Sequence, residues 1–115
     1  MDNLVREFNS DMKNIYMTAK REIGYNATRF LQLISIYGGL QAAKILISKV
    51  EATYGFEKLC EYNRLELSVE YHVLLAKYKS LFTLEERKEC AQHLLDYNFP
   101  LSEEMKSILY EGNDR

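Results

Sequence analysis

Apolar residues recur every three or four positions along most of this 115-residue chain, and no other feature constrains its fold as strongly. A period near 3.6 residues gives one apolar stripe on an α-helix, whereas a half-buried strand needs strict alternation. Residues 2–22 predict such a helix, and its stripe is formed by Leu4, Phe8, Met12, Ile15 and Ala19. A stripe of this kind is also compatible with a helix–helix dimer.

Glycine and proline divide the rest of the chain into shorter segments. Gly38-Gly39 is the strongest break, because glycine enters the left-handed backbone region without steric cost. Pro100 ends a later segment, since proline cannot continue a helix. Further helices are predicted at residues 27–37, 40–51, 56–62, 69–78, 84–97 and 103–109, with a turn at 53–55.

Polar residues at the starts of these segments support the division. Asn26, Ser68 and Ser102 are predicted N-caps, whose side-chain oxygens accept hydrogen bonds from otherwise free backbone amides. Thr83 and Glu86 have the spacing of a capping box, in which each side chain accepts from the backbone amide of the other residue. The helix that follows Thr83 is therefore the most clearly delimited one.

Few residues alternate between apolar and polar in the manner of a strand. Residues 64–69 come closest, and a short extended segment there is an open alternative. Five glycines and a single proline disfavour a sheet protein rich in turns. The sequence therefore predicts an all-α fold, a single-domain compact bundle of six or seven short helices over residues 1–111, with a frayed tail at 112–115.

The charge distribution gives no overall drive toward nucleic acid, because the formal net charge is −2. Residues 1–50 are net basic, and the remainder is net acidic. No apolar run approaches the roughly 20 residues of a membrane span, and the first residues lack the pattern of a signal peptide. We therefore expect a cytoplasmic protein without membrane contact, in which Cys60 and Cys90 are reduced thiols.

Two stretches of the chain carry a family resemblance. They are Tyr-Asn-Ala-Thr-Arg-Phe-Leu at residues 25–31, followed by Gly38-Gly39, and Arg-Leu-Glu-Leu-Ser-Val-Glu at residues 64–70. Together they resemble a widespread group of small bacterial helical proteins, over roughly residues 8–97. The resemblance implies a bacterial, phage or mobile-element origin and an intracellular helical protein, and it implies no catalytic residue. One departure is that this group is expected to have tryptophan near Glu61, whereas this chain has none.

A metal site or a catalytic thiol is the first chemistry to consider. Cys60, His72, Cys90 and His93 are the ligand types of tetrahedral zinc, and Cys90 and His93 share one predicted helix. Cys60 and His72 have no chelating partner close in sequence, and free cysteine is commonly a small core residue. The chain has no strained nucleophile turn and no phosphate-binding loop. We therefore expect no metal, no cofactor and no enzymatic activity.

Residues 27–51 have the outline of a helix-turn-helix, with two predicted helices joined at Gly38-Gly39. Arg29, Lys44 and Lys49 lie in this segment and are the candidate contacts to nucleic acid. The second of these helices is otherwise mostly apolar, whereas a helix in the major groove needs a polar face and cations for phosphate. A nucleic-acid-binding regulator is therefore the alternative function.

Two interpretations of Arg64, Glu70 and Tyr71 stay open. The charged residues, together with Arg29 and Glu66, are compatible with a partly buried ion pair that joins the two halves of the chain. Alternatively, they line a partner-binding groove, and tyrosine, of which the chain has nine, is enriched at protein interfaces. We expect a non-catalytic helical interaction or regulatory module whose partner is another protein, with a second copy of the chain as one candidate.

Overall fold

The computed structural model describes residues 2–48 and 54–112, and all of its regular structure in these ranges is helical. The prediction of an all-α fold is therefore confirmed. The elements are α1 (Asp2–Ile23), α2 (Thr28–Tyr37), α3 (Gly39–Ile47), α4 (Tyr54–Glu61), η1 (Leu65–Leu67), α5 (Val69–Val73), η2 (Ala76–Leu81), α6 (Leu84–Asp96), α7 (Glu103–Ser107) and η3 (Ile108–Tyr110), where η denotes a 3₁₀ helix.

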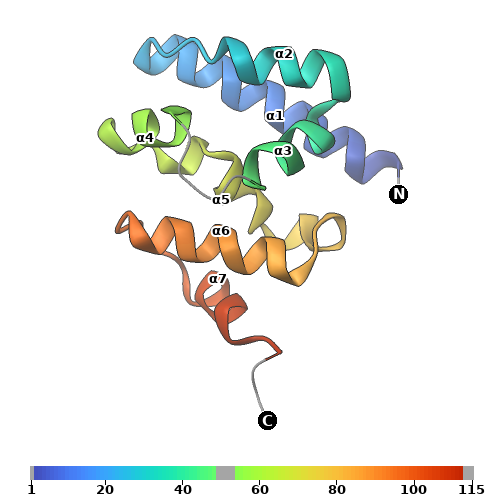
Figure 1. Cartoon of the computed structure of the whole chain (residues 1–115), viewed down its shortest axis with the longest axis vertical. Coiled ribbons are helices and arrows are strands. Elements are labelled where there is room, and N and C mark those ends of the chain that lie inside the picture. The colour runs from blue at the N-terminus through green and yellow to red at the C-terminus, as the bar shows by residue number, and fades with distance from the viewer. Residues whose placement is uncertain (1, 49–53, 113–115) are drawn as a thin grey trace.

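The helices form successive tiers from one end of the molecule to the other (Figure 1). Helices α1 and α2 lie side by side at one end, and α3 packs against both. Helices α4 and α5 occupy the middle, α6 packs against α5, and α7 with η3 closes the other end beneath α6. No helix in the described parts of the chain is both long enough and apolar enough to cross a membrane.

The stripe on α1 faces the core, as its spacing predicts. Phe8 and Met12 are fully buried, and the ring of Phe8 meets Tyr78 and Phe82 edge-on at centroid distances of 4.9 and 5.4 Å. The interpretation of this stripe as a dimer surface is therefore wrong, because the tiers of its own chain cover it. The remaining buried apolar residues include Ile34, Ala42, Phe56, Leu59, Val73, Leu74, Cys90, Ala91, Leu94, Leu101 and Ile108.

The predicted break at Gly38-Gly39 is confirmed, and the two glycines have different roles. Gly38 has a φ of 85°, which an L side chain rarely adopts. Gly39 is buried against α1, where an added Cβ would lie 2.8 Å from the Cα of Asn9. The side-chain oxygen of Asn9 accepts a hydrogen bond from the backbone amide of Leu40 at 2.9 Å. A side chain of α1 therefore accepts a hydrogen bond from one of the backbone amides that the start of α3 leaves without an internal partner.

Three of the four predicted caps are confirmed. Ser68 and Ser102 accept from the backbone amides three residues later, and Thr83 forms the complete capping box with Glu86. Asn26 is not an N-cap, because α2 begins after Ala27 without a side-chain cap. The side-chain oxygen of Asn26 instead accepts a hydrogen bond from the hydroxyl of Tyr16 at 2.6 Å.

The predicted helix at residues 69–78 is divided in two, which corrects the sequence interpretation. Helix α5 ends at Val73, and η2 starts only at Ala76. The guanidinium of Arg87 donates to the carbonyl oxygens of Val73 and Leu74 at 3.3 and 3.0 Å. These are carbonyls that the end of a helix leaves without an internal partner. Arg87 is only 4% exposed and thus acts as a buried C-terminal cap for α5.

The other differences concern element boundaries. The extended segment considered at residues 64–69 is wrong, because η1 and the cap of α5 occupy it. Helix α4 begins at Tyr54, so the last two residues of the predicted turn at 53–55 are helical. Helix α3 ends at Ile47, whereas the predicted helix extended to residue 51. Residues 49–53 and most of the predicted tail, 113–115, lie outside the described residues.

Candidate functional site

Arg64 joins the first helix to the middle of the fold through a charged cluster. Its guanidinium lies 2.7 Å from a carboxylate oxygen of Glu22 at the end of α1 and 2.6 Å from one of Glu66 in η1. Hydrogen bonding and the positive charge of Arg64 lower the pKa of Glu22, and the two carboxylates raise the pKa of Arg64. The predicted ion pair between the two halves therefore exists, and Arg64 forms it.

Glu70 pairs with a histidine and not with one of the arginines considered from the sequence. Its carboxylate is 8% exposed and lies 3.3 Å from Nδ1 of His93 on α6. The imidazole of His93 stacks on the ring of Phe56 at a centroid distance of 4.1 Å and an interplanar angle of 10°. Glu70 therefore faces the core between α5 and α6 and does not line an exposed groove.

Tyr71 lies at the centre of a half-buried aromatic group on the surface. Its ring contacts the rings of Phe99 and His72 edge-on, at centroid distances of 5.6 and 5.8 Å. Leu75, in the break between α5 and η2, is also half-buried. We call these four residues the Tyr71 face. Tyr71 was predicted from the sequence as part of a partner surface, whereas the other three were not. Phe99 could not be, because it follows α6 and only the fold brings it to Tyr71.

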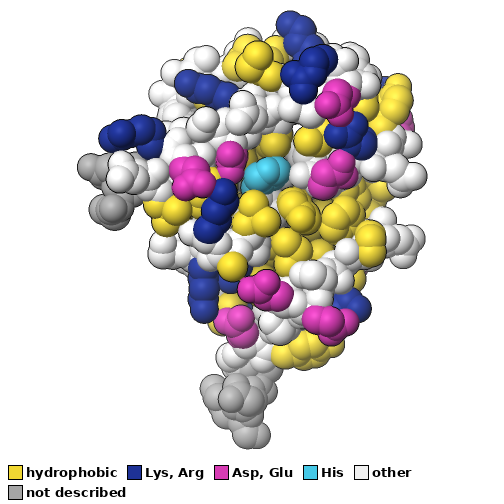
Figure 2. Space-filling view, turned by 180° about the vertical axis from the view of Figure 1, so that it is seen from behind, with side chains coloured by type: hydrophobic (Ala, Val, Ile, Leu, Met, Phe, Trp, Pro, Cys, Tyr) yellow, Lys and Arg dark blue, Asp and Glu magenta, His cyan; other side chains and the backbone are white. Residues whose placement is uncertain are grey.

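Carboxylates surround the apolar area on this side of the molecule. Figure 2 shows apolar side chains gathered in the middle of one face, with acidic side chains on three sides of them and basic side chains interspersed. Near His72, Lys77 pairs with Glu7 at 2.7 Å and lies 4.0 Å from Asp11. The Arg64 cluster has two further carboxylates and two cations, because Arg21 lies 3.5 Å from Glu22. These two clusters together contain four acids and three bases, so their combined charge is negative by one.

Two of the three predicted nucleic-acid contacts, Arg29 and Lys44, lie in the described part of the chain and have different surroundings. Lys44 of α3 pairs with Glu86 of α6 at 3.1 Å, and its ammonium lies over the ring of Phe82 at 4.8 Å. Arg29 is exposed on the first turn of α2. Lys49 lies outside the described residues. Because α3 packs against α1, α2 and α5, it has no continuous polar face to place in a groove.

The candidate metal and thiol chemistry finds no support in the geometry. Within residues 2–48 and 54–112, no three His, Cys, Asp or Glu side chains come together as a metal site. Cys90 is buried, and that burial raises the pKa of its thiol, which disfavours a nucleophilic thiolate. Cys60 is half-buried in α4. Nδ1 of His72 lies 2.9 Å from the backbone carbonyl of Ser68 and serves as its donor.

Arg29 also borders a cavity of about 520 Å³ between α1, the start of α2, α3, α4 and the segment from η1 into α5. This cavity has a separate lining from the Tyr71 face, which contributes none of its four residues. Two distinct features of the surface thus remain after the core is accounted for.

Comparison with protein-family models, curated proteins and solved structures found no match to this chain, so the resemblance to small bacterial proteins stays a prediction.

Proposed function

We propose that this chain is a non-catalytic helical interaction module that binds a basic amphipathic helix of a partner protein on the Tyr71 face. The observation that carries the proposal is the aromatic group around Tyr71 within a net negative border. Aromatic side chains provide large contact areas at a small cost in conformational entropy. We further propose that the protein acts in a bacterial or phage-infected cytoplasm.

The chemistry of the partner follows from the charges around the apolar area. A helix that lays leucine or phenylalanine side chains on Tyr71 and Phe99 extends over the carboxylates on either side. The carboxylates available to such a helix are Glu7 and Asp11 beside Lys77, and Glu22 and Glu66 beside Arg64. Lysine or arginine at the flanks of the incoming helix accelerates association, and acidic flanks are rejected.

The experiment is a titration with two designed peptides of about 18 residues, one of leucine and lysine and one of leucine and glutamate with the same apolar pattern. Backbone amide shifts of the protein should change mainly around residues 71–75 and 99 with the lysine peptide. We expect this peptide to bind at least about tenfold more tightly than the glutamate peptide, with the difference shrinking at high salt.

Two variants make the titration specific. Tyr71→Glu places a charge in the apolar area and should abolish binding, while Tyr37→Glu serves as the matched control because Tyr37 is 54% exposed on α2. Equal binding of both peptides, or shifts that avoid the Tyr71 face, would refute the proposal. Binding of duplex DNA at about 50 mM salt, lost in Arg29→Ala with Lys44→Ala, would instead favour the nucleic-acid alternative.

A further inference from the structure

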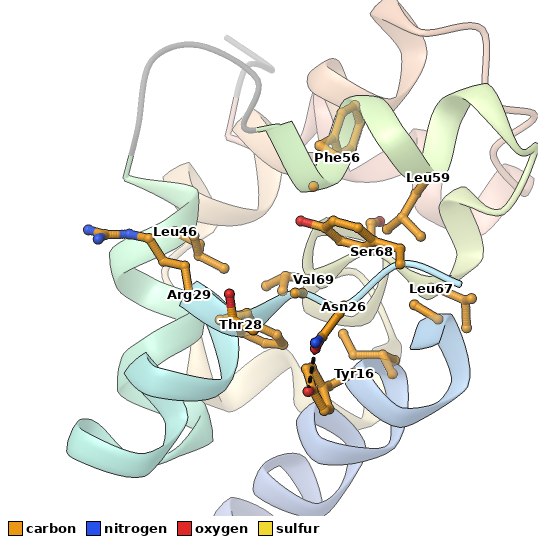
Figure 3. A pocket seen from close by; sticks show the side chains of 16 residues that line it. Tyr16, Asn26, Thr28, Arg29, Leu46, Phe56, Leu59, Leu67, Ser68 and Val69 are labelled. Atoms are coloured by element: carbon orange, nitrogen blue, oxygen red, sulfur yellow. Dashed lines mark hydrogen bonds between the residues drawn. The ribbon is translucent and has the colours of Figure 1, made fainter. Parts of the chain in front are cut away.

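The cavity next to α2 has the size and lining of a small-molecule site. Its volume of about 520 Å³ lies within the roughly 300–1,000 Å³ that ligand pockets occupy. Figure 3 shows side chains from α1, α2, α3, α4 and the η1–α5 segment arranged around one space. Five segments between residues 15 and 69 therefore form its walls.

The interior of the cavity is apolar and makes no unmet hydrogen-bonding demand. Ile15, Phe30 and Val69 are buried apolar residues of the lining. Ser68 is the buried polar residue of the described lining, and its hydroxyl already donates to the carbonyl of Leu65 at 2.7 Å and accepts from the amide of Tyr71 at 3.1 Å. A ligand in this space therefore gains from hydrocarbon and not from polar groups.

The rim of the cavity is polar and positively charged. Asn26, Thr28 and Arg29 are exposed lining residues, and Arg29 is the charged side chain among those that the structure describes there. Figure 3 shows the guanidinium of Arg29 extended outward from the rim, where a long flexible side chain can turn toward a ligand. The first turn of α2 contains no acidic residue, so nothing there opposes an anion.

We propose that this cavity binds a medium-chain aliphatic carboxylate, with the hydrocarbon inside and the carboxylate at the rim beside Arg29. The apolar interior selects the chain, and the charge at the rim selects an anionic head over a neutral one. This site is separate from the Tyr71 face, so either proposal can fail while the other holds.

The first measurement is titration calorimetry with hexanoate, octanoate, decanoate and dodecanoate below their micelle concentrations. Burial of each additional methylene group should improve affinity about fourfold until the cavity is full. Amide and methyl shifts should change around Ile15, Phe30 and Val69 and not around Phe99. An affinity that does not depend on chain length, or shifts outside the cavity lining, would overturn the proposal.

The second measurement compares dodecanoate with dodecan-1-ol on variants of the rim. Arg29→Gln should weaken dodecanoate about threefold and leave the alcohol unchanged, because an exposed ion pair contributes modestly. Lys13→Gln, which removes an exposed cation of α1 outside the lining, is the matched control. Equal loss of both ligands in Arg29→Gln, or no loss of dodecanoate, would contradict the assignment of the head group.

A blocked cavity provides the final test. Leu46 lies at the cavity wall and is half-buried, so Leu46→Trp should fill the space and weaken dodecanoate at least about tenfold. The chain has no other tryptophan, so its fluorescence also reports whether the variant is folded. If that variant does not fold, Ala27→Leu replaces it at a half-buried position of the same lining. Undiminished binding in a folded, blocked variant excludes the cavity as the site.

Discussion

The hydroxyl of Tyr78 donates a hydrogen bond to a carboxylate oxygen of Asp11 at 2.5 Å, which ties η2 to α1. The ring of Tyr78 is fully buried and meets Phe8 edge-on. Burial, the bond to Asp11 and its negative charge raise the pKa of Tyr78, so the phenol remains a proton donor throughout the physiological range. One side chain thus combines core packing with a charged hydrogen bond between distant segments.

Removal of this hydroxyl alone should lower the stability of the protein. Tyr78→Phe keeps the ring, and we expect it to lower the free energy of unfolding by about 1–2 kcal/mol, because a hydrogen bond to a charged acceptor is lost. Urea denaturation measures the difference. Tyr110→Phe is the control, since Tyr110 is 73% exposed and should change little. Equal stability of the wild type and Tyr78→Phe would show that the bond contributes nothing net.

Arg87 should be among the most sensitive charged residues for folding. Arg87→Met leaves the carbonyls of Val73 and Leu74 without their donor, and we expect a loss of about 2–4 kcal/mol in denaturant unfolding. Arg87→Lys should restore little, because a lysine ammonium cannot reproduce the planar set of donors. Arg6→Met, at an exposed position of α1, should stay within about 0.5 kcal/mol of the wild type. Full stability of Arg87→Lys would argue that the charge matters and the geometry does not.

The glycines at the α2–α3 junction should respond differently to alanine. Gly39→Ala forces a methyl group against the backbone of Asn9, and we expect a loss of about 2–3 kcal/mol. Gly38→Ala meets no atom within 4 Å, so its cost should be only the backbone strain at φ 85° and ψ 164°, about 1–2 kcal/mol. Thermal unfolding of the two variants tests this order. A larger loss for Gly38→Ala would place the constraint in backbone conformation and not in helix packing.

His72 should contribute to loss of stability in mild acid. Burial lowers the pKa of His72 in the folded protein, so the unfolded chain binds the proton more readily than the folded one. The stability that the neutral form of His72 contributes is therefore fully present above the ordinary histidine pKa of about 6.5. It declines as the pH falls below that value. The negative charge of Asp11 raises the pKa of His72, and the positive charge of Lys77 lowers it further.

His72→Gln should flatten the dependence of the melting temperature on pH between about 7 and 5. The control is His93→Gln, because His93 faces the carboxylate of Glu70 and its replacement leaves the contribution of His72 in place. An unchanged slope in His72→Gln would mean that other groups account for the sensitivity to acid.

Local patterns predicted much of the helical structure. The capping box at Thr83 and Glu86 and the cap at Ser68 were predictable because each involves partners three residues apart. The stripe containing Phe8 and Met12 was predictable because burial follows the helical period. The candidate site was harder to predict from the sequence. Tyr71 was identified from its residue type, but its contact with Phe99 depends on a link that follows α6.

The sequence by itself determined that this chain is helical, where most of its helices begin, and which faces are buried, because these properties depend on neighbours within one or two turns. The tertiary structure alone decided that Arg87 caps the end of α5 and that Asn9 caps the start of α3. It also decided that the side-chain oxygen of Asn26 accepts a hydrogen bond from Tyr16. It also decided that Glu70 pairs with His93 and not with an arginine. The physical reason is that a polar group bonds to the partner that packing brings within reach, and sequence distance carries no record of that packing.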